Sequence, residues 1–196
     1  MMHHMKAVVQ PLVSAVPVHG ALLTPVLGID PGLRRTGYAV LTAPVGLDAC
    51  RVVEAGVVQL NPRQPIERRL VALERSLDEL ISVHRPAVLA CEQLYAHYRH
   101  PRTAIVMAHA RGVILALAAR RGLTVVNVSA THVKKHLTGS GRASKAQIQR
   151  AIAATLNLPK VPEPNDVADA LAVALCSLRM HAAERRLTPA AKGERR

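Results

Sequence analysis

The chain has 196 residues, 49% of them hydrophobic, so it can bury a core, which excludes intrinsic disorder over most of its length. Uninterrupted apolar runs fall well short of the roughly 18 residues of a membrane helix, and three widely spaced cysteines (Cys50, Cys91 and Cys176) argue against a disulfide framework and suit a reducing cytoplasm. A net charge of +13 points to a polyanionic partner, although charge alone says nothing about the fold.

The first part of the chain predicts an extension followed by three strands. Residues 1–24 are apolar but broken by prolines, which matches a signal peptide poorly, so we expect an extension with little structure. Residues 25–30 form a short apolar run that ends in an acid, and a glycine-bearing turn joins this strand to a second one at 37–41. A third strand is predicted at 50–60.

Two helices and two further strands are predicted in the middle of the chain. Leucine and isoleucine recur every three or four residues over 66–81, which is typical of an amphipathic helix. An apolar strand at 87–91 ends at Glu92, and a helix rich in small apolar residues follows over 103–120. A glycine ends that helix, and residues 123–128 predict another strand.

The last part of the chain predicts three helices, over 129–135, 144–156 and 165–178, each beginning at a residue suited to capping. Residues 179–196 are rich in basic side chains and predict a frayed C-terminal tail. The alternation of strands and helices predicts one α/β domain over 25–178.

Four acids are the candidates for chemistry. Asp30 and Glu92 each end an apolar strand, where the sites of α/β sheets gather. Asp166 and Asp169 lie three residues apart in the first turn of the last helix, so they share one face. Acids in a first turn also complement the helix dipole, which is the alternative reading of this pair. However, Asp169 belongs to a helix so apolar that the core must surround most of it, and this favours a cluster of all four acids.

Four neighbouring carboxylates need a counter-charge, because each raises the pKa of the others. Mg²⁺ prefers carboxylate oxygens and leaves positions for water and phosphate. Two such ions about 4 Å apart can support phosphodiester hydrolysis. The acids therefore predict a metal site of the kind that a nuclease uses.

No Asp or Glu occurs from Gln93 to Pro162. A merely basic surface is one explanation, but surfaces usually mix both signs of charge, so the stretch favours contact with a nucleic-acid backbone. Its basic residues are Arg99, Arg102, Arg111, Arg120, Arg121, Lys134, Lys135, Arg142, Lys145, Arg150 and Lys160.

A series of short motifs in this order resembles the RuvC family, the bacterial Holliday-junction resolvases of RNase H-like fold, and it spans about residues 26–178. The resemblance implies a mixed five-stranded sheet flanked by helices. The motifs are Leu27-Gly-Ile-Asp-Pro-Gly32, Thr36-Gly-Tyr38, Cys91-Glu-Gln93, Ala110-Arg-Gly-Val113, Val133-Lys134, Gly139-Ser-Gly-Arg-Ala143 with Lys145, and Asp166-Val-Ala-Asp-Ala-Leu171.

The resemblance implies that Asp30, Glu92, Asp166 and Asp169 are the metal-binding catalytic acids, the last of which is His in some members. Two ions per site are expected, Mg²⁺ with Mn²⁺ as a possible substitute. The reaction implied is symmetric cleavage of a four-way DNA junction that leaves 5′-phosphate and 3′-hydroxyl ends.

The resemblance also implies DNA contacts. Lys134 and Lys145 match basic positions near the scissile phosphate and the junction backbone, and Tyr95 matches an aromatic residue, usually Phe, that stacks on bases. Arg102 and Arg142 are further candidates, because both lie in the stretch without acids and Arg142 ends a glycine-bearing loop that suits a phosphate. A plain flexible loop and an ordinary surface lysine are the alternatives for Arg142 and Lys145.

Two glycines and two histidines are the remaining residues with a candidate role. Gly28 and Gly32 are expected to serve backbone geometry, by allowing a tight turn and a close approach to metal or phosphate. His132 and His136 lie four residues apart on a short predicted helix. We interpret them as surface or phosphate-side residues rather than zinc ligands.

Members of the family act as homodimers, which matches the two-fold symmetry of a four-way junction. The apolar helix over 103–120 is our candidate for the dimer face, with burial against the sheet as the alternative. The resemblance further implies the branch-migration proteins RuvA and RuvB as partners, and we expect action in the cytoplasm with no membrane partner.

Three other functions stay open at this point. An RNase H-like nuclease of another substrate, such as an RNA-processing relative, would differ in what it cuts, and Tyr95 favours branched DNA. A non-catalytic nucleic-acid-binding module predicts an incomplete set of acids, whereas all four positions are filled. An actin-like ATPase needs a second phosphate-binding glycine-rich segment and a longer chain.

Overall fold

The computed structural model describes residues 8–14, 25–43, 50–94 and 101–187. Its elements in chain order are β1 (Val8–Ser14), β2 (Val26–Asp30), β3 (Arg35–Thr42), β4 (Arg51–Gln59), α1 (Ile66–His84), β5 (Val88–Glu92), α2 (Pro101–Arg120), β6 (Thr124–Val128), α3 (Ala130–Thr138), α4 (Lys145–Thr155) and α5 (Asn165–Leu187).

The strands form one mixed sheet in the order β1-β4-β3-β2-β5-β6. β2 and β3 pair antiparallel as a hairpin, β4 and β1 continue antiparallel, and β5 and β6 run parallel to β2. The five strands predicted from sequence are all present, at the predicted places and in one mixed sheet.

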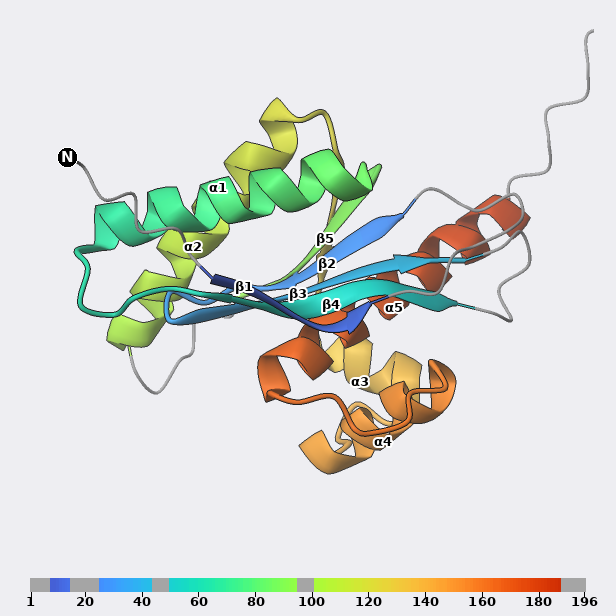
Figure 1. Cartoon of the computed structure of the whole chain (residues 1–196). Coiled ribbons are helices and arrows are strands. Elements are labelled where there is room, and N and C mark those ends of the chain that lie inside the picture. The colour runs from blue at the N-terminus through green and yellow to red at the C-terminus, as the bar shows by residue number, and fades with distance from the viewer. Residues whose placement is uncertain (1–7, 15–24, 44–49, 95–100, 188–196) are drawn as a thin grey trace, which may run out of the picture.

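Helices cover both faces of this sheet (Figure 1). α1 and α2 bury one face and α3, α4 and α5 bury the other, so the molecule has two apolar cores. Both cores are aliphatic apart from Tyr38, which is fully buried, as expected for a packing residue in a chain without Phe or Trp. Its hydroxyl donates to Glu54 Oε1 at 2.6 Å.

Helix α5 lies directly across β2 and β3. A Cβ on Gly28 of β2 would stand 2.5 Å from the Ala170 carbonyl oxygen and 2.6 Å from the Ala174 Cβ, so only glycine leaves room for the helix. The close approach that we expected Gly28 to allow is therefore made by α5, rather than by metal or phosphate. Gly32 does serve a tight turn, because its Cβ would stand 2.1 Å from the Arg35 carbonyl oxygen.

Two predictions about the ends of the chain are wrong in part. Residues 8–14, expected to carry little structure, form β1 at the sheet edge, with a bulge between Pro11 and Val13. Pro is tolerated there because edge strands and bulges do not need every backbone donor. The last helix continues beyond 178 to Leu187, into the stretch expected to fray. The remainder of both predicted tails, 1–7, 15–24 and 188–196, lies outside the described residues.

The sequence contains no uninterrupted apolar run long enough for a membrane helix, whereas part of helix α2 meets the length and mean hydropathy of one. Its segment Arg102–Arg120 has a mean hydropathy of 1.4 and is long and apolar enough to cross a membrane by length and composition alone. Isoleucine, valine, leucine and alanine raise the mean hydropathy of this segment around a central arginine. That residue, Arg111, donates to the Glu92 carbonyl oxygen at 3.1 Å and to the Asn127 side chain, which ties α2 to the ends of β5 and β6.

Candidate functional site

Two of the four candidate acids meet because of strand register. β2 and β5 are parallel neighbours in which Ile29 lies beside Cys91. The next residue on each strand is an acid, so Asp30 and Glu92 leave the sheet together at its carboxyl edge, and the two side chains are hydrogen-bonded. The position is the one that α/β sheets use for sites.

The other two acids reach the same point through the start of α5. The backbone of Asp166 rests on Gly37 of β3, where a Cβ would stand 1.9 Å from the Asp166 carbonyl oxygen. Gly37 is the cross-strand partner of Asp30, so this contact sets the first turn of α5 over the end of β2. Asp166 and Asp169 both act electrostatically on Asp30. The structure thus brings together all four acids that the sequence singled out.

The pKa values of Asp30 and Glu92 reflect the burial of these acids and the charges of their neighbours. Burial, followed by the negative charges of Glu92, Asp169 and Asp166, raises the pKa of Asp30 to about 8. Burial and the charge of Asp169 also raise the pKa of Glu92. Near neutral pH the Asp30–Glu92 pair consequently retains a proton in the absence of a cation.

Three basic side chains border the acids. Arg35 Nε lies 3.2 Å from Asp166 Oδ2, and Lys145 Nζ lies 3.0 Å from Asp169 Oδ2. Lys145 also acts on Asp30 and Glu92, and Lys134 acts on Glu92. The two lysines lower the pKa values of Asp30 and Glu92, but burial and the neighbouring acids outweigh them, so both values stay raised.

The donor set fits a hard divalent cation. Every side chain of the cluster offers carboxylate oxygen, which Mg²⁺ prefers. The two inner carboxyls, Asp30 and Glu92, are satisfied mainly by each other, and a cation would replace the proton that they retain. The outer pair, Asp166 and Asp169, is 25% and 32% exposed, which leaves a side open to substrate.

The predicted DNA contacts fall into three groups. Lys134 on α3 and Lys145 at the start of α4 lie beside the acids, and Arg142 is exposed in the connection between these helices. Arg102 is exposed near the start of α2, which covers the other face of the sheet (Figure 1). Tyr95 lies outside the described residues.

Part of the basic stretch serves the fold. Arg120 and Arg121 at the end of α2 pair with Glu74 and Asp78 of α1, so they join the two helices of one layer. The charge that remains beside the acids belongs to α3, α4 and their connection.

Sequence reasoning missed three residues that build the site. Arg35 and Gly37 follow the first strand, and Arg111 supports the backbone at Glu92. Gly37 and Arg111 lie within motifs that were quoted, so their positions gave a signal, whereas their roles depend on contacts between distant elements. For Arg35, the sequence offered no signal beyond a positive charge five residues after Asp30.

A comparison with protein families decides the identity. The sequence model of the family described as crossover junction endodeoxyribonuclease RuvC matches residues 26–177. The chain belongs to the RuvC family. It is therefore an enzyme of the crossover junction endodeoxyribonuclease class, as the motifs predicted.

Relatives in this family are similar over most of their length. The RuvC of Rhodopirellula baltica is 50% identical over 151 residues, covering 77% of this chain and 84% of the relative. The RuvC of Pelotomaculum thermopropionicum is 40% identical over 162 residues, covering 83% of this chain and 97% of the relative.

Solved structures confirm the predicted RNase H-like α/β architecture. A T. thermophilus RuvC in complex with Holliday junction substrate is 31% identical with a TM-score of 0.75, covering 84% of this chain and 96% of that chain. The yeast mitochondrial Holliday junction resolvase, at 16% identity and a TM-score of 0.61, shares the fold. Membership of the RuvC family removes the actin-like ATPase as an alternative.

Proposed function

We propose that the chain resolves four-way DNA junctions by divalent-metal-dependent hydrolysis of phosphodiester bonds. The observation that carries the proposal is the gathering of four carboxylates from β2, β5 and α5 at one sheet edge, with Lys134 and Lys145 beside them. A structure of a relative, the T. thermophilus RuvC, is described as a complex with Holliday junction substrate, which supports the same substrate here.

The four acids would hold the metal. We infer Mg²⁺, two ions per site, from the all-oxygen donor set, with Mn²⁺ as a substitute. Bound divalent ions would activate water and stabilise the leaving oxygen. The end groups expected are 5′-phosphate and 3′-hydroxyl, as the family resemblance implies.

The chain's own residues prepare the site for this reaction. The Asp30–Glu92 pair retains a proton, and a cation must displace that proton in order to bind. Burial of the pair therefore keeps the two carboxyls from being fully ionised until a cation binds. Lys145 and Arg35 hold Asp169 and Asp166 in place and present positive charge towards the open side. Both cations are more exposed than the acids they pair with, so they are available to a phosphate on this side.

DNA contacts extend from the acids along α3 and α4. We propose that Lys134, Lys145 and Arg142 neutralise phosphates of one arm of the junction, since they lie on adjoining elements. Tyr95 follows Glu92 by three residues and would stack on bases near the junction centre. Arg102, on the opposite layer, would reach DNA only at the rim of the footprint.

The exposed face of α2 supports a homodimer. Its outward side carries Ile105, which is 57% exposed, followed by Ala108, Gly112 and Ala116, all exposed. Small side chains along one exposed face leave room for a second helix to approach, and two copies paired through it would give the two symmetric sites that paired nicks require.

Two further expectations belong to the same proposal. The RuvA and RuvB branch-migration proteins are expected partners through the family resemblance. We expect the chain to act in the cytoplasm, where its DNA substrate is and where its three cysteines stay reduced.

The deciding experiment is cleavage of a labelled synthetic four-way junction and a matched linear duplex in Mg²⁺, Mn²⁺ or EDTA. We expect symmetric paired nicks on the junction with either metal, and none on the duplex or in EDTA. Asp30→Asn should abolish cutting and retain junction binding. Equal cutting of the duplex, or cutting by Asp30→Asn at the normal rate, would overturn the proposal.

Binding tests the DNA surface separately from the chemistry. Lys134→Ala should weaken junction binding and lower the slope of log affinity against log salt by about 1. Arg75→Ala is the matched control, because this arginine is exposed on α1, on the layer away from α3 and α4. The same salt slope for both variants would remove Lys134 from the DNA contacts.

A further inference from the structure

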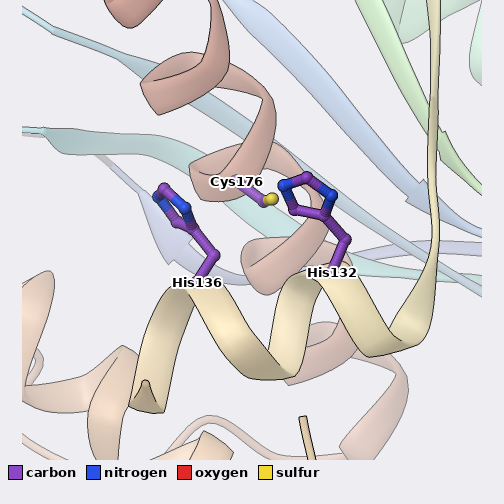
Figure 2. Close-up of side chains that lie close together, drawn as sticks. All are labelled: His132, His136 and Cys176. Atoms are coloured by element: carbon purple, nitrogen blue, oxygen red, sulfur yellow. The ribbon is translucent and has the colours of Figure 1, made fainter. Parts of the chain in front are cut away.

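Two imidazoles and a thiol converge at a place that the proposed function does not use. His132 and His136 lie one turn apart on α3 and point towards α5, where Cys176 points back between them (Figure 2). Their ligand atoms, one nitrogen from each histidine and the Cys176 Sγ, all lie within 4.8 Å of one another. This spacing would allow the three side chains to hold a metal ion, at a place separate from the four acids.

One of the three groups has a buried nitrogen without a hydrogen-bond partner among the described residues. The His136 Nε2 is buried and has no hydrogen-bond partner in the described part of the chain. Buried polar atoms are nearly always satisfied, so this unpartnered nitrogen, on a histidine of the cluster, calls for a ligand. Cys176 is fully buried, with its thiol on the face of α5 that meets α3.

The donor set differs from that of the catalytic acids. Four carboxylates suit a hard ion such as Mg²⁺, whereas two imidazoles and a thiolate suit a borderline ion such as Zn²⁺. We propose that His132, His136 and Cys176 form a zinc site that joins α3 to α5, with a fourth position open to water. The site could not be predicted from the spacing of residues in the sequence, because the third ligand lies 40 positions beyond His136.

The three ligand atoms must move slightly closer together to bind zinc. Zinc bonds of about 2.0–2.1 Å to nitrogen and 2.3 Å to sulfur place tetrahedral donors roughly 3.5 Å apart, so atoms now within 4.8 Å must approach by about 1 Å. His132 is exposed and its ring can turn without disturbing the core. The open position lies on that exposed side.

One neighbouring charge acts in both directions. Arg179, three residues after Cys176, affects both His136 and Cys176 electrostatically. Burial raises the pKa of the Cys176 thiol to about 11, and the charge of Arg179 acts in the opposite sense by favouring the thiolate that zinc requires. The same charge opposes a second cation, and the thiolate offsets part of the charge of the ion. Zn²⁺ with one thiolate has a net charge of +1, so the site would hold a single positive charge near Arg179.

The position gives the site a consequence for the DNA surface. α3 carries Lys134, and α5 carries Asp166 and Asp169 at its start. A bound ion would fix these two helices to each other, and with them the distance between a DNA-contacting lysine and the catalytic acids. We expect the role to be structural, because Cys176 lies seven residues beyond Asp169 on α5, about two helical turns from the acids.

The test uses the reduced full chain in excess Mg²⁺, so that the four acids do not take up the probe. His3 and His4 are changed to alanine in every sample, because they offer a second pair of imidazoles. Co²⁺ serves as the optical probe and Zn²⁺ affinity is measured by competition with a chromophoric chelator. We expect one Co²⁺ per chain with sulfur-to-cobalt charge-transfer absorption, its displacement by Zn²⁺, and a higher thermal unfolding midpoint with Zn²⁺.

Variants identify the ligands. Cys176→Ala should remove the charge-transfer absorption, and His132→Ala should lower Zn²⁺ affinity at least tenfold. Cys50→Ser and His109→Ala are the matched controls and should change neither, because the Cys50 thiol and the exposed imidazole on α2 are not in the cluster.

Three results would overturn the zinc site: no charge-transfer absorption in the parent, absorption that survives Cys176→Ala, or equal Zn²⁺ affinity in His132→Ala and His109→Ala. If Cys176→Ala does not fold, His132→Ala decides, because its side chain is exposed.

Discussion

At the end of β2, the Asp30 carboxyl lies among three other acids and its pKa is raised to about 8 from 3.8. An acid with a raised folded-state pKa stabilises the fold only while it is protonated. Below about pH 4 both the folded and the unfolded chain bind the proton; as pH rises from 4 to 8, the unfolded chain releases it first, so stability falls through this window.

Asp30→Asn should therefore raise the stability of the metal-free protein at pH 8, on the order of 1–3 kcal/mol, with the difference vanishing near pH 4. The measurement is urea unfolding in EDTA at a series of pH values. Asp78→Asn is the control with the opposite sign, because Arg121 lowers the pKa of that exposed carboxyl. Parallel pH profiles for Asp30→Asn and the parent would show that neither burial nor the neighbouring acids raise the pKa of Asp30.

At the scale of elements, the placement of α5 depends on glycines rather than on the acids themselves. Gly37→Ala would put a Cβ 1.9 Å from the Asp166 carbonyl oxygen, so the start of α5 must move away from the end of β2. We expect junction cleavage to fall at least tenfold while binding in EDTA is retained, at a stability cost of about 1–3 kcal/mol.

Ile81→Val is the comparison for Gly37→Ala, since it costs about 0.5–1.5 kcal/mol in the core between α1 and the other face of the sheet. It should cut junctions at the normal rate. Equal cleavage by both variants would mean that the position of α5 does not limit the reaction.

The same element explains how far the sequence could predict the site. Asp30 and Glu92 were predictable because each ends an apolar run, and strand ends are readable from residue order. Asp166 and Asp169 were predictable as a pair on one helix face, whereas their place over Gly37 depends on packing between elements 129 residues or more apart. The cluster of His132, His136 and Cys176 was missed for the same reason.

Local patterns also explain the errors in the fold. β1 pairs with β4 across some 45 residues and contains a proline, so nothing local marked it as a strand. The length of α5 was misjudged because its last turns are basic, like a tail, although they continue the helix to Leu187.

At the scale of the whole molecule, the symmetric cleavage that we propose would need two copies of the chain. The exposed side of α2 that we propose as the dimer face includes Gly112, where a Cβ would meet nothing within 4 Å. A glycine in the middle of an exposed helix costs about 1 kcal/mol relative to alanine. Close approach of a second helix is a physical reason for a small residue at that position.

Gly112→Glu should separate the copies without harming the fold, because glutamate favours the helix and has open space within one chain. Sedimentation should show the parent as a dimer and the variant as a monomer. Each monomer still holds all four acids, so on a cruciform plasmid single nicks should replace the paired cuts that linearise the circle. Val83→Glu, at a side chain 73% exposed on α1, adds the same charge elsewhere and should remain dimeric. A monomeric parent, or a dimeric Gly112→Glu that still linearises the plasmid, would place the two-fold interface on another surface.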